Sequence, residues 1–395
     1  MHEIAVGVLR QSQVVDELLA RFIARGINSV AGPLLDVLRV GAYQLRFLDR
    51  VPPHAAVTTT VALARELVNE RAAGFANAVL RKVAAVPRDP SDAMRPVGGA
   101  QQAAPPSAKA SHPQWLVTRW TDRFGPDAAD TLLAWNNTKP PLVLQPTRGT
   151  LSGLERKLRD NGIACSRAAY DAGIVVEESR PERLPGFAGG EFFVQDPAQA
   201  LVVRFTGFGP DAVVYDACAA PGGKLLGLSY RSGRVIAADR SRVRLARVIE
   251  NLGRAGRGAE YVVVADAMHP PIHPVRAYLL DAPCLGTGSF ARHPDARLRV
   301  TMAALLQLAA AQAAMLDAAA ARIAPGGVLC YATCSLEPEE NEMQVNAFLQ
   351  RHRDFERQPP ATFPGELLTS NGDLLTLPQR DRIDGAFAAR LVRAG

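Results

Sequence analysis

The stretch AVVYDACAAPGGK, residues 212–224, passes from a continuous apolar run into a turn of small residues that ends in Gly222, Gly223 and Lys224. A short apolar run of this kind is typical of a strand that is covered on both faces of a sheet. Similar runs follow in GRVIAADR, AEYVVVADA, AYLLDA and GGVLCYATC, with helix-like segments between them. Strands that alternate with helices predict an α/β fold built on a doubly wound parallel sheet.

Each predicted strand ends at an acidic residue or a thiol. These residues are Asp216, Asp239, Asp266, Asp281 and Cys334. Ligands of open α/β sheets bind outside the carboxyl ends of the strands, so we expect these side chains to share one binding edge. The turn lacks the phosphate-cradling GxGxxG spacing, and the chain has no Walker lysine motif. The pattern therefore favours a nucleoside ligand without a polyphosphate, and S-adenosylmethionine fits that description.

Asp239 has two interpretations. An acidic residue about 20 positions after a glycine-rich turn is well placed to bind ribose hydroxyls. An aspartate directly after a strand is also a common cap of the next helix. Its position after the turn favours the ribose.

The chain has five cysteines, and two of them lie in CYATCSLEPEENE, residues 330–342. Cys330 lies inside an apolar run and is expected to be structural, as is Cys165, whereas Cys334 stands at the strand end. No CxxC pair and no histidine at zinc-ligand spacing accompanies the cysteines, so we expect no metal site. An intracellular chain of this size does not need disulfides, so the thiols are expected to be free.

The net charge of +6 is carried mainly by arginine. Genomic base composition explains this as well as bidentate contacts to the phosphates of a nucleic acid do. No run approaches the ~18 apolar residues that a membrane span needs, and MHEIAVGVLR does not resemble a signal peptide. The sequence therefore predicts a cytoplasmic, monomeric protein that is not bound to a membrane.

The chain divides into segments of different periodicity. Residues 1–87 show three- and four-residue apolar spacing throughout, which predicts an all-α domain. Residues 88–111 are rich in Pro, Gly, Ala and Ser and are expected to form a flexible linker. Residues 112–193 predict helices and a small α+β connecting region, and residues 194–395 predict the catalytic α/β domain.

Several of these segments resemble one known family. DACAAPGGK (216–224), LLDAPCLGTGSFARHPDARLR (279–299) and GGVLCYATCSLEPEENE (326–342) resemble the signature motifs of the RNA cytosine-5 methyltransferases, in particular the Sun/Fmu type that modifies 16S ribosomal RNA. Residues 37–67 and 75–83 are similar to the NusB-type RNA-binding helical domain of that family. The family usually has more helix before this part, so we expect either that the helical domain is shortened at its amino end or that the true start lies upstream. The resemblance implies a Rossmann-like methyltransferase domain, S-adenosylmethionine as cofactor and 16S rRNA as partner.

The resemblance also implies roles for individual residues. Cys334 would be the nucleophile and Cys284 the second cysteine, which helps to release the product. The cofactor contacts would be Cys218, Ala219, Ala220, Pro221, Gly222, Gly223, Lys224, Asp239, Asp266 and Asp281.

The chemistry explains why these residue types are needed. Thiolate addition to carbon 6 of cytosine makes carbon 5 nucleophilic enough to accept a methyl group. Asp281 can hydrogen-bond the edge of the base, and Lys224 can lower the pKa of a thiol or contact the base. Arg292 and His293 are equally well explained as phosphate contacts or as a solvated loop. The acidic residues after Cys334 are expected only to favour the amino end of the following helix.

Other functions have also to be considered. A DNA cytosine-5 methyltransferase would use Cys284 itself as the nucleophile, but the presence of both cysteine motifs favours RNA. The substrate can also be a different RNA. A non-catalytic RNA-binding or ribosome-assembly factor could be built on the helical domain alone, although the intact cysteine motifs argue against it. A metal or redox protein is the least favoured, because the thiols lack chelating spacing.

Overall fold

The computed structural model describes residues 2–87, 111–178, 180–257 and 261–395. Most of the linker predicted over 88–111 lies outside the described residues. The chain forms two compact units: Met1–Thr138 with Phe290–Arg299, and Lys139–Ser289 with Val300–Gly395. The segment boundaries expected from the sequence remain predictions, because the two compact units do not correspond one to one to the four expected segments.

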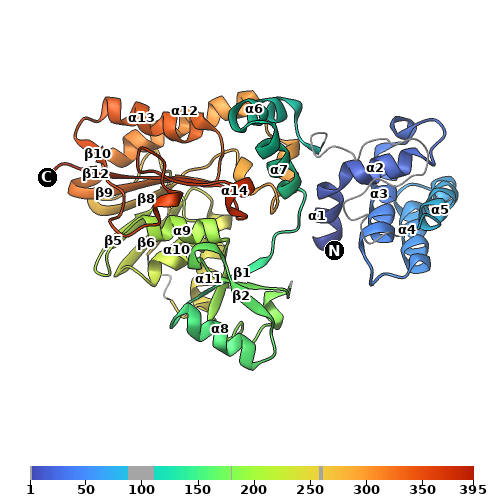
Figure 1. The fold of residues 1–395 in the computed structure, drawn as a ribbon, viewed down its shortest axis with the longest axis horizontal. Coiled ribbons are helices and arrows are strands. Elements are labelled where there is room, and N and C mark those ends of the chain that lie inside the picture. Colours follow the sequence, from blue (N-terminus) through green and yellow to red (C-terminus); the bar gives the residue numbers. More distant parts are fainter. Residues whose placement is uncertain (1, 88–110, 179, 258–260) are drawn as a thin grey trace. The chain divides into compact units, whose positions relative to one another are not determined.

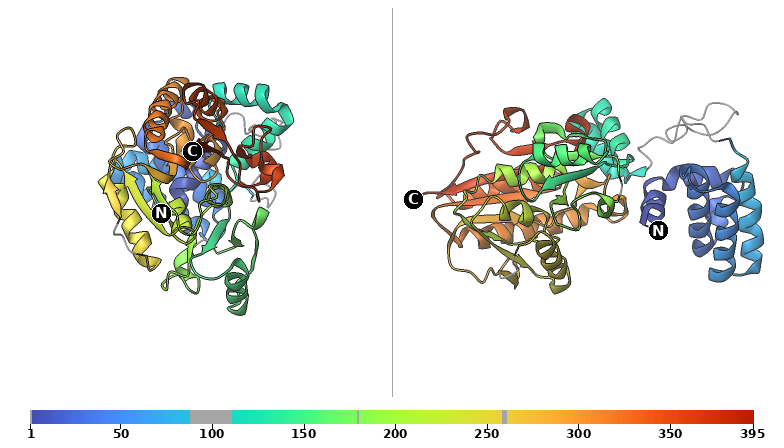
Figure 2. Two further views of the ribbon diagram at one scale, coloured as in Figure 1. Left: turned by 90° about the vertical axis from the view of Figure 1, so that its left-hand side faces the viewer. Right: turned by 90° about the horizontal axis from the view of Figure 1, so that it is seen from below.

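The amino-terminal part is all-α, as predicted. Its helices are α1 (His2–Arg10), α2 (Ser12–Ala20), α3 (Gly32–Phe47), α4 (Pro53–Leu67) and α5 (Glu70–Ala84). Of these, α3, α4 and α5 pack side by side (Figure 2). Asn69 caps α5 by accepting a hydrogen bond from the Ala72 amide. Gly41 lets α3 approach its neighbours, because a Cβ there would lie 2.8 Å from side-chain carbons of Leu80 and Thr60.

The same unit contains a helical pair, α6 (Gln114–Phe124) and α7 (Pro126–Asn136). The fully buried Trp120 packs against Phe290, with ring centroids 6.1 Å apart. The buried Arg297 donates to the Asn137 side chain at 2.6 Å and to the Asn136 carbonyl. These contacts tie Phe290–Arg299 to the helical pair.

The second unit begins with a small antiparallel sheet of order β2-β3-β1-β4. Its strands are β1 (Leu142–Pro146), β2 (Cys165–Arg167), β3 (Ile174–Val176) and β4 (Phe192–Val194). Helix α8 (Leu151–Asp160) covers one face and buries Leu154 and Leu158 against the strands (Figure 1). Cys165, expected to be structural, is half-buried at the start of β2.

The large sheet has the order β10-β12-β9-β8-β5-β6-β7, with β11 paired to β12. The parallel strands are β5 (Val213–Asp216), β6 (Arg234–Asp239), β7 (Val262–Val264), β8 (Val275–Asp281) and β9 (Ile323–Thr333). Antiparallel strands at one end are β10 (Phe355–Arg357), β11 (Leu374–Thr376) and β12 (Ala386–Arg393). The predicted parallel sheet is confirmed for its core, with antiparallel additions beside β9.

Helices cover both faces of this sheet, which explains its continuous apolar strands. Side chains such as Tyr278 and Tyr331 face α12 (Met302–Ala320) and α13 (Glu342–Arg351). Their neighbours Leu279 and Cys330 face α9 (Pro197–Phe205) and α10 (Gly223–Ser229) on the other side (Figure 1). Helix α11 (Arg242–Arg254) packs beside α10 over β6. Cys330 is fully buried in this core.

Helix α12 corrects one expectation from the sequence. This helix of 19 residues is long and apolar enough to cross a membrane by length and composition, and no such run was expected. It packs on β8 and β9 through Met315, Leu316 and Ala319. Its Gln312 is fully buried, and the side-chain amide donates to the Pro283 carbonyl. One such helix is weak evidence for a span, because core helices of soluble proteins have the same composition.

Candidate active site

The strand ends predicted to share a binding edge do so. The strands β9, β8, β5 and β6 are neighbours, and all run in the same direction. Asp239, Asp281 and Cys334 therefore stand at the same edge. Along this sheet, the chain reverses its strand order between β5 and β8, the place where open α/β sheets bind ligands. A cavity of about 250 Å³ opens there.

The turn after β5 presents only part of its length to the cavity. Cys218, Ala220 and Lys224 line it. Ala219 is instead buried, and its amide donates to the Ala238 carbonyl at 2.8 Å. Of the ten expected cofactor contacts, Ala219, Pro221, Gly222 and Gly223 do not line the cavity.

Gly222 explains how this turn reaches the helix. It has a φ of +105° directly before α10, a left-handed conformation that favours glycine. The Asn251 side chain on α11 donates to the Pro221 carbonyl at 3.2 Å. The second half of the turn is therefore shaped by the need to start α10 and to pack on α11.

The two predicted catalytic cysteines lie side by side. The Sγ atoms of Cys284 and Cys334 are 3.5 Å apart, although 50 residues separate them in the chain. The hydrogen bond with the Cys284 thiol and the nearby Lys224 ammonium lower the pKa of Cys334, against the opposing effect of burial. The same hydrogen bond, together with burial, holds the pKa of Cys284 well above its usual range. Cys334 is thus the thiol that ionises first.

Lys224 and Asp281 form an ion pair beside the thiols. The Lys224 Nζ donates to the Asp281 Oδ2 at 2.7 Å, and the lysine side chain is only 11% exposed. Burial alone would lower the pKa of Lys224, but the Asp281 carboxylate and the Cys334 thiol raise it. The lysine therefore stays charged and favours the thiolate form of Cys334.

Asp239 and Asp266 line the other side of the cavity. The Asp239 carboxylate accepts hydrogen bonds from the Ser241 amide at 2.7 Å and from Arg244 at 2.8 Å. Ser241, not Asp239, caps α11, so the interpretation of Asp239 as a helix cap is wrong. The exposed Asp266 accepts from the Met268 amide at 2.9 Å.

Asp216 is buried beneath the site. It is 1% exposed, and neither carboxylate oxygen has a hydrogen-bond partner within the described parts of the chain. Burial and the neighbouring Asp281 raise the pKa of Asp216 to about 8, although Lys224 opposes the shift. A carboxyl of this kind is held largely in its neutral form at neutral pH.

Sequence reasoning missed Glu340, which was expected only to favour the start of a helix. Its buried carboxylate accepts hydrogen bonds from the Leu285 amide at 3.0 and 3.2 Å and from Gln312 at 3.1 Å. Burial raises the pKa of Glu340 to about 7. No local pattern identifies this role, because Leu285 and Gln312 are distant in the sequence.

Two glycines bring the cysteine loops together. A Cβ at Gly288 would lie 2.7 Å from backbone atoms of Gly385 and 2.9 Å from the Cys334 carbonyl. The Gly288 amide donates to that same carbonyl at 3.0 Å, and the Gly385 amide donates to the Gly288 carbonyl at 2.8 Å. Glycine is required at position 288 because three backbone segments meet there.

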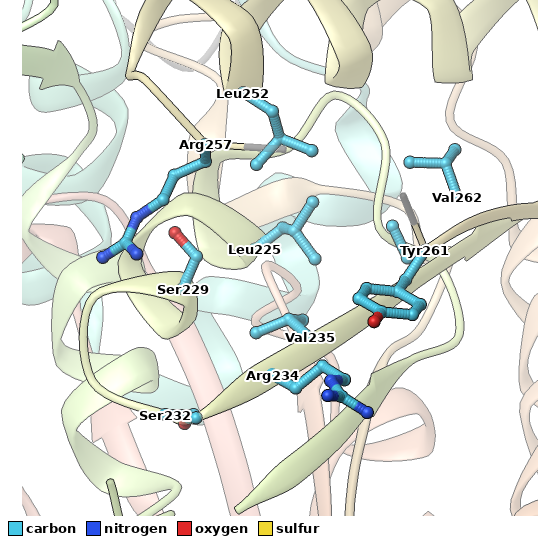
Figure 3. A pocket seen from close by; sticks show the side chains of 11 residues that line it. Leu225, Ser229, Ser232, Arg234, Val235, Leu252, Arg257, Tyr261 and Val262 are labelled. Atoms are coloured by element: carbon cyan, nitrogen blue, oxygen red, sulfur yellow. The ribbon is translucent and has the colours of Figure 1, made fainter. Parts of the chain in front are cut away.

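A second cavity, of about 290 Å³, lies at the amino end of β6 (Figure 3). Its lining side chains include Arg234 and Arg257, Ser229 and Ser232, but no thiol or carboxylate. This cavity therefore lacks the thiols and acids that the sequence predicted for the site.

Two further expectations concern groups outside the thiol pair. In the described part of the chain, no group of three or more His, Cys, Asp or Glu side chains is arranged to hold a metal ion. Arg292 is half-buried and His293 is exposed in the segment that belongs to the other compact unit. Both interpretations of that pair stay predictions.

Successive parts of the chain match known families. The NusB family matches residues 1–85, a ferredoxin-like domain described as Methyltr_RsmF/B-like matches residues 112–181, and the family described as 16S rRNA methyltransferase RsmB/F matches residues 208–392.

Individual relatives match nearly the whole chain. It is 35% identical to the ribosomal RNA small subunit methyltransferase B of Pseudomonas putida, over 99% of this chain and 89% of that protein. It is 31% identical to a probable ribosomal RNA small subunit methyltransferase B of Synechocystis sp., over 99% of this chain and 90% of that protein. A solved structure of a methyltransferase homolog protein from Pyrococcus horikoshii shares the fold with a TM-score of 0.62, at 23% identity over 73% of this chain and 100% of that one.

Proposed function

Because the chain belongs to the 16S rRNA methyltransferase RsmB/F family, we propose that it methylates carbon 5 of a cytosine in 16S rRNA through a covalent cysteine–cytosine adduct. Methyl transfer to small-subunit ribosomal RNA follows from membership of the family. The position on the base, the covalent route and the residue roles are the finer part of the proposal. The expected NusB-like helical domain and methyltransferase fold are confirmed by the family matches.

The observation that carries the proposal is the pair of thiols 3.5 Å apart beside the Lys224–Asp281 ion pair. Cys334, whose pKa is lowered, supplies the thiolate that adds to carbon 6 of the cytosine. Asp281, held by Lys224 at 2.7 Å, is close enough to the thiols to contact the edge of the bound base. The added electron pair makes carbon 5 the nucleophile.

We propose S-adenosylmethionine as the cofactor of this cavity, where it would supply an electrophilic methyl group. Carboxylates of Asp239 and Asp266 line the cavity and can accept hydrogen bonds from the hydroxyl and amino groups of a nucleoside. The small side chains of Cys218 and Ala220 leave room beside them. These residues and Lys224 would hold the cofactor.

Cys284 assists the release of the product. After methyl transfer, the proton on carbon 5 is lost to solvent, the bond between carbon 6 and the Cys334 Sγ breaks, and Cys334 leaves as a thiolate. Cys284 keeps its own proton because its pKa is raised, so it can donate a hydrogen bond to the leaving thiolate across 3.5 Å.

The test separates the two cysteines. Cys334→Ala should lose methylation and form no adduct, whereas Cys284→Ala should accumulate a covalent protein–RNA species on a denaturing gel. Bisulfite sequencing of 16S rRNA from cells that lack this gene should reveal the cytosine that loses its protection. Full activity of Cys334→Ala with a dead Cys284→Ala would reverse the assignment. A chain that fails to bind S-adenosylmethionine in calorimetry would instead favour a non-catalytic assembly factor.

We also propose that the protein acts as a cytoplasmic monomer. The support for the compartment is its substrate, because 16S rRNA is made and assembled in the cytoplasm of bacteria.

A further inference from the structure

We infer that Glu340 is a positioning residue that holds the backbone of Cys284 against Cys334 for release of the methylated RNA. This inference rests on the proposed function, because the step that it affects is the breakdown of the covalent adduct. The carboxylate touches neither of the two thiols through a hydrogen bond. It acts through the peptide groups on both sides of Cys284.

The peptide groups that flank Cys284 are both fixed. The Leu285 amide, which follows the cysteine, donates to the Glu340 carboxylate at 3.0 and 3.2 Å. The Pro283 carbonyl, which precedes it, accepts from the Gln312 side chain at 2.8 Å. Because these two peptide planes set the backbone torsions of Cys284, the Glu340–Gln312 pair fixes the direction of the bond from its Cα to its Cβ.

The pair is itself one unit that is anchored to the strand of the other cysteine. Gln312 donates to the Glu340 Oε1 at 3.1 Å, the same oxygen that accepts the shorter bond from Leu285. The Glu340 carbonyl accepts a hydrogen bond from the Tyr331 hydroxyl at 2.6 Å. Tyr331 lies on β9, which ends directly before Cys334. Glu340 therefore ties the Cys284 loop to the strand that carries the nucleophile.

A carboxylate is a costly choice for a purely structural acceptor. Glu340 is fully buried, and a buried carboxyl is destabilising unless its hydrogen bonds compensate. A neutral acceptor would satisfy the Leu285 amide at a lower cost. The carboxyl group offers two oxygens, so Glu340 holds the Leu285 amide at 3.0 and 3.2 Å while its Oε1 also accepts from Gln312. These hydrogen bonds hold the Cys284 loop in the position where the two thiols lie 3.5 Å apart.

The experiment compares Glu340→Ala, Glu340→Gln and Cys284→Ala on 16S rRNA transcribed in vitro, with a radiolabelled methyl donor. Adduct formation and adduct release are followed separately on denaturing gels. Glu340→Ala should slow release about 100-fold, the effect of misplacing a reacting group by ~1 Å, and slow adduct formation much less. Glu340→Gln keeps an acceptor at the Oε1 position for both donors and should restore release to within about tenfold of the parent. Glu339→Gln removes a charge from the same turn without touching the Leu285 amide and should release RNA at the parental rate.

The possible outcomes differ in what they overturn. Parental release by Glu340→Ala, while Cys284→Ala traps the adduct, overturns this inference and leaves the proposed function intact. Equal loss of adduct formation and of thermal stability in both Glu340 variants also overturns it, because the role would then be structural. If Glu340→Ala does not fold, Gln312→Ala frees the Pro283 carbonyl, leaves the Leu285 amide bound to Glu340, and should still slow release. Absence of a trapped adduct in Cys284→Ala overturns the proposed covalent route, and this inference with it.

Discussion

The buried carboxyl of Asp216 makes the stability of the methyltransferase unit depend on pH in an unusual direction. Burial first, and then Asp281, raise its pKa from 3.8 to about 8. A folded protein that holds a proton more tightly than the unfolded chain is stabilised by that proton. The stabilisation is complete below the unfolded pKa and is lost as the pH rises towards 8.

Asp216→Asn removes this titration while keeping the shape of the side chain. One pKa unit corresponds to about 1.4 kcal/mol, so the difference in unfolding free energy between variant and parent should grow by up to about 3 kcal/mol from pH 5.5 to 7.5. The free energy of unfolding of the variant therefore rises relative to that of the parent at the higher pH. Any constant cost of burying an amide cancels, because it is the same at both pH values.

The assay has to report on the correct unit. Trp115, Trp120 and Trp135 all lie in the first compact unit, so tryptophan fluorescence would follow the other part of the chain. Hydrogen exchange of the peptide that contains β5, measured for variant and parent at the same pH, gives the local opening free energy. Asp266→Asn, which changes an exposed carboxylate of the same cavity, is the matched control. A difference between Asp216→Asn and the parent that is identical at both pH values would refute the argument from burial.

Two further predictions concern the thiol pair and the close backbone approach at Gly288. Cys284→Ala removes the hydrogen bond that lowers the pKa of Cys334, so the pH dependence of Cys334 alkylation by iodoacetamide should move to higher pH, and an unchanged profile would show that Cys284 does not donate. Gly288→Ala places a methyl group 2.7 Å from the Gly385 backbone and should lower the free energy of unfolding in urea by about 3 kcal/mol. Gly253→Ala, on an open helix surface, should raise the free energy of unfolding by up to about 1 kcal/mol. Equal effects of the two substitutions would contradict the close approach at Gly288.

The fold and much of the site could be predicted from local patterns. The apolar run of 213–216 and its successors required a sheet covered on both faces, because exposed strands would alternate with polar residues. Parallel strands place their carboxyl ends at one edge, so Asp239, Asp281 and Cys334 had to gather there. The length and apolar composition of α12 were missed, because Asp317 and the glutamines of this segment interrupt its apolar residues.

The parts that could not be predicted depend on contacts between distant segments. Ser241 rather than Asp239 caps α11, since capping is decided by backbone torsions and not by residue type alone. The burial of Glu340 depends on α12 and on the Cys284 loop, neither of which is near it in sequence.

The sequence by itself determined the chemistry available to this protein: a thiol at a strand end, a second thiol after a proline and acids along the same edge. Only the tertiary structure decided which thiol ionises first. That choice depends on a 3.5 Å contact between the two sulfur atoms and on an ion pair between Lys224 and Asp281. Electrostatic and hydrogen-bond energies fall steeply with distance, and distances across a sheet edge are set by packing rather than by position in the chain.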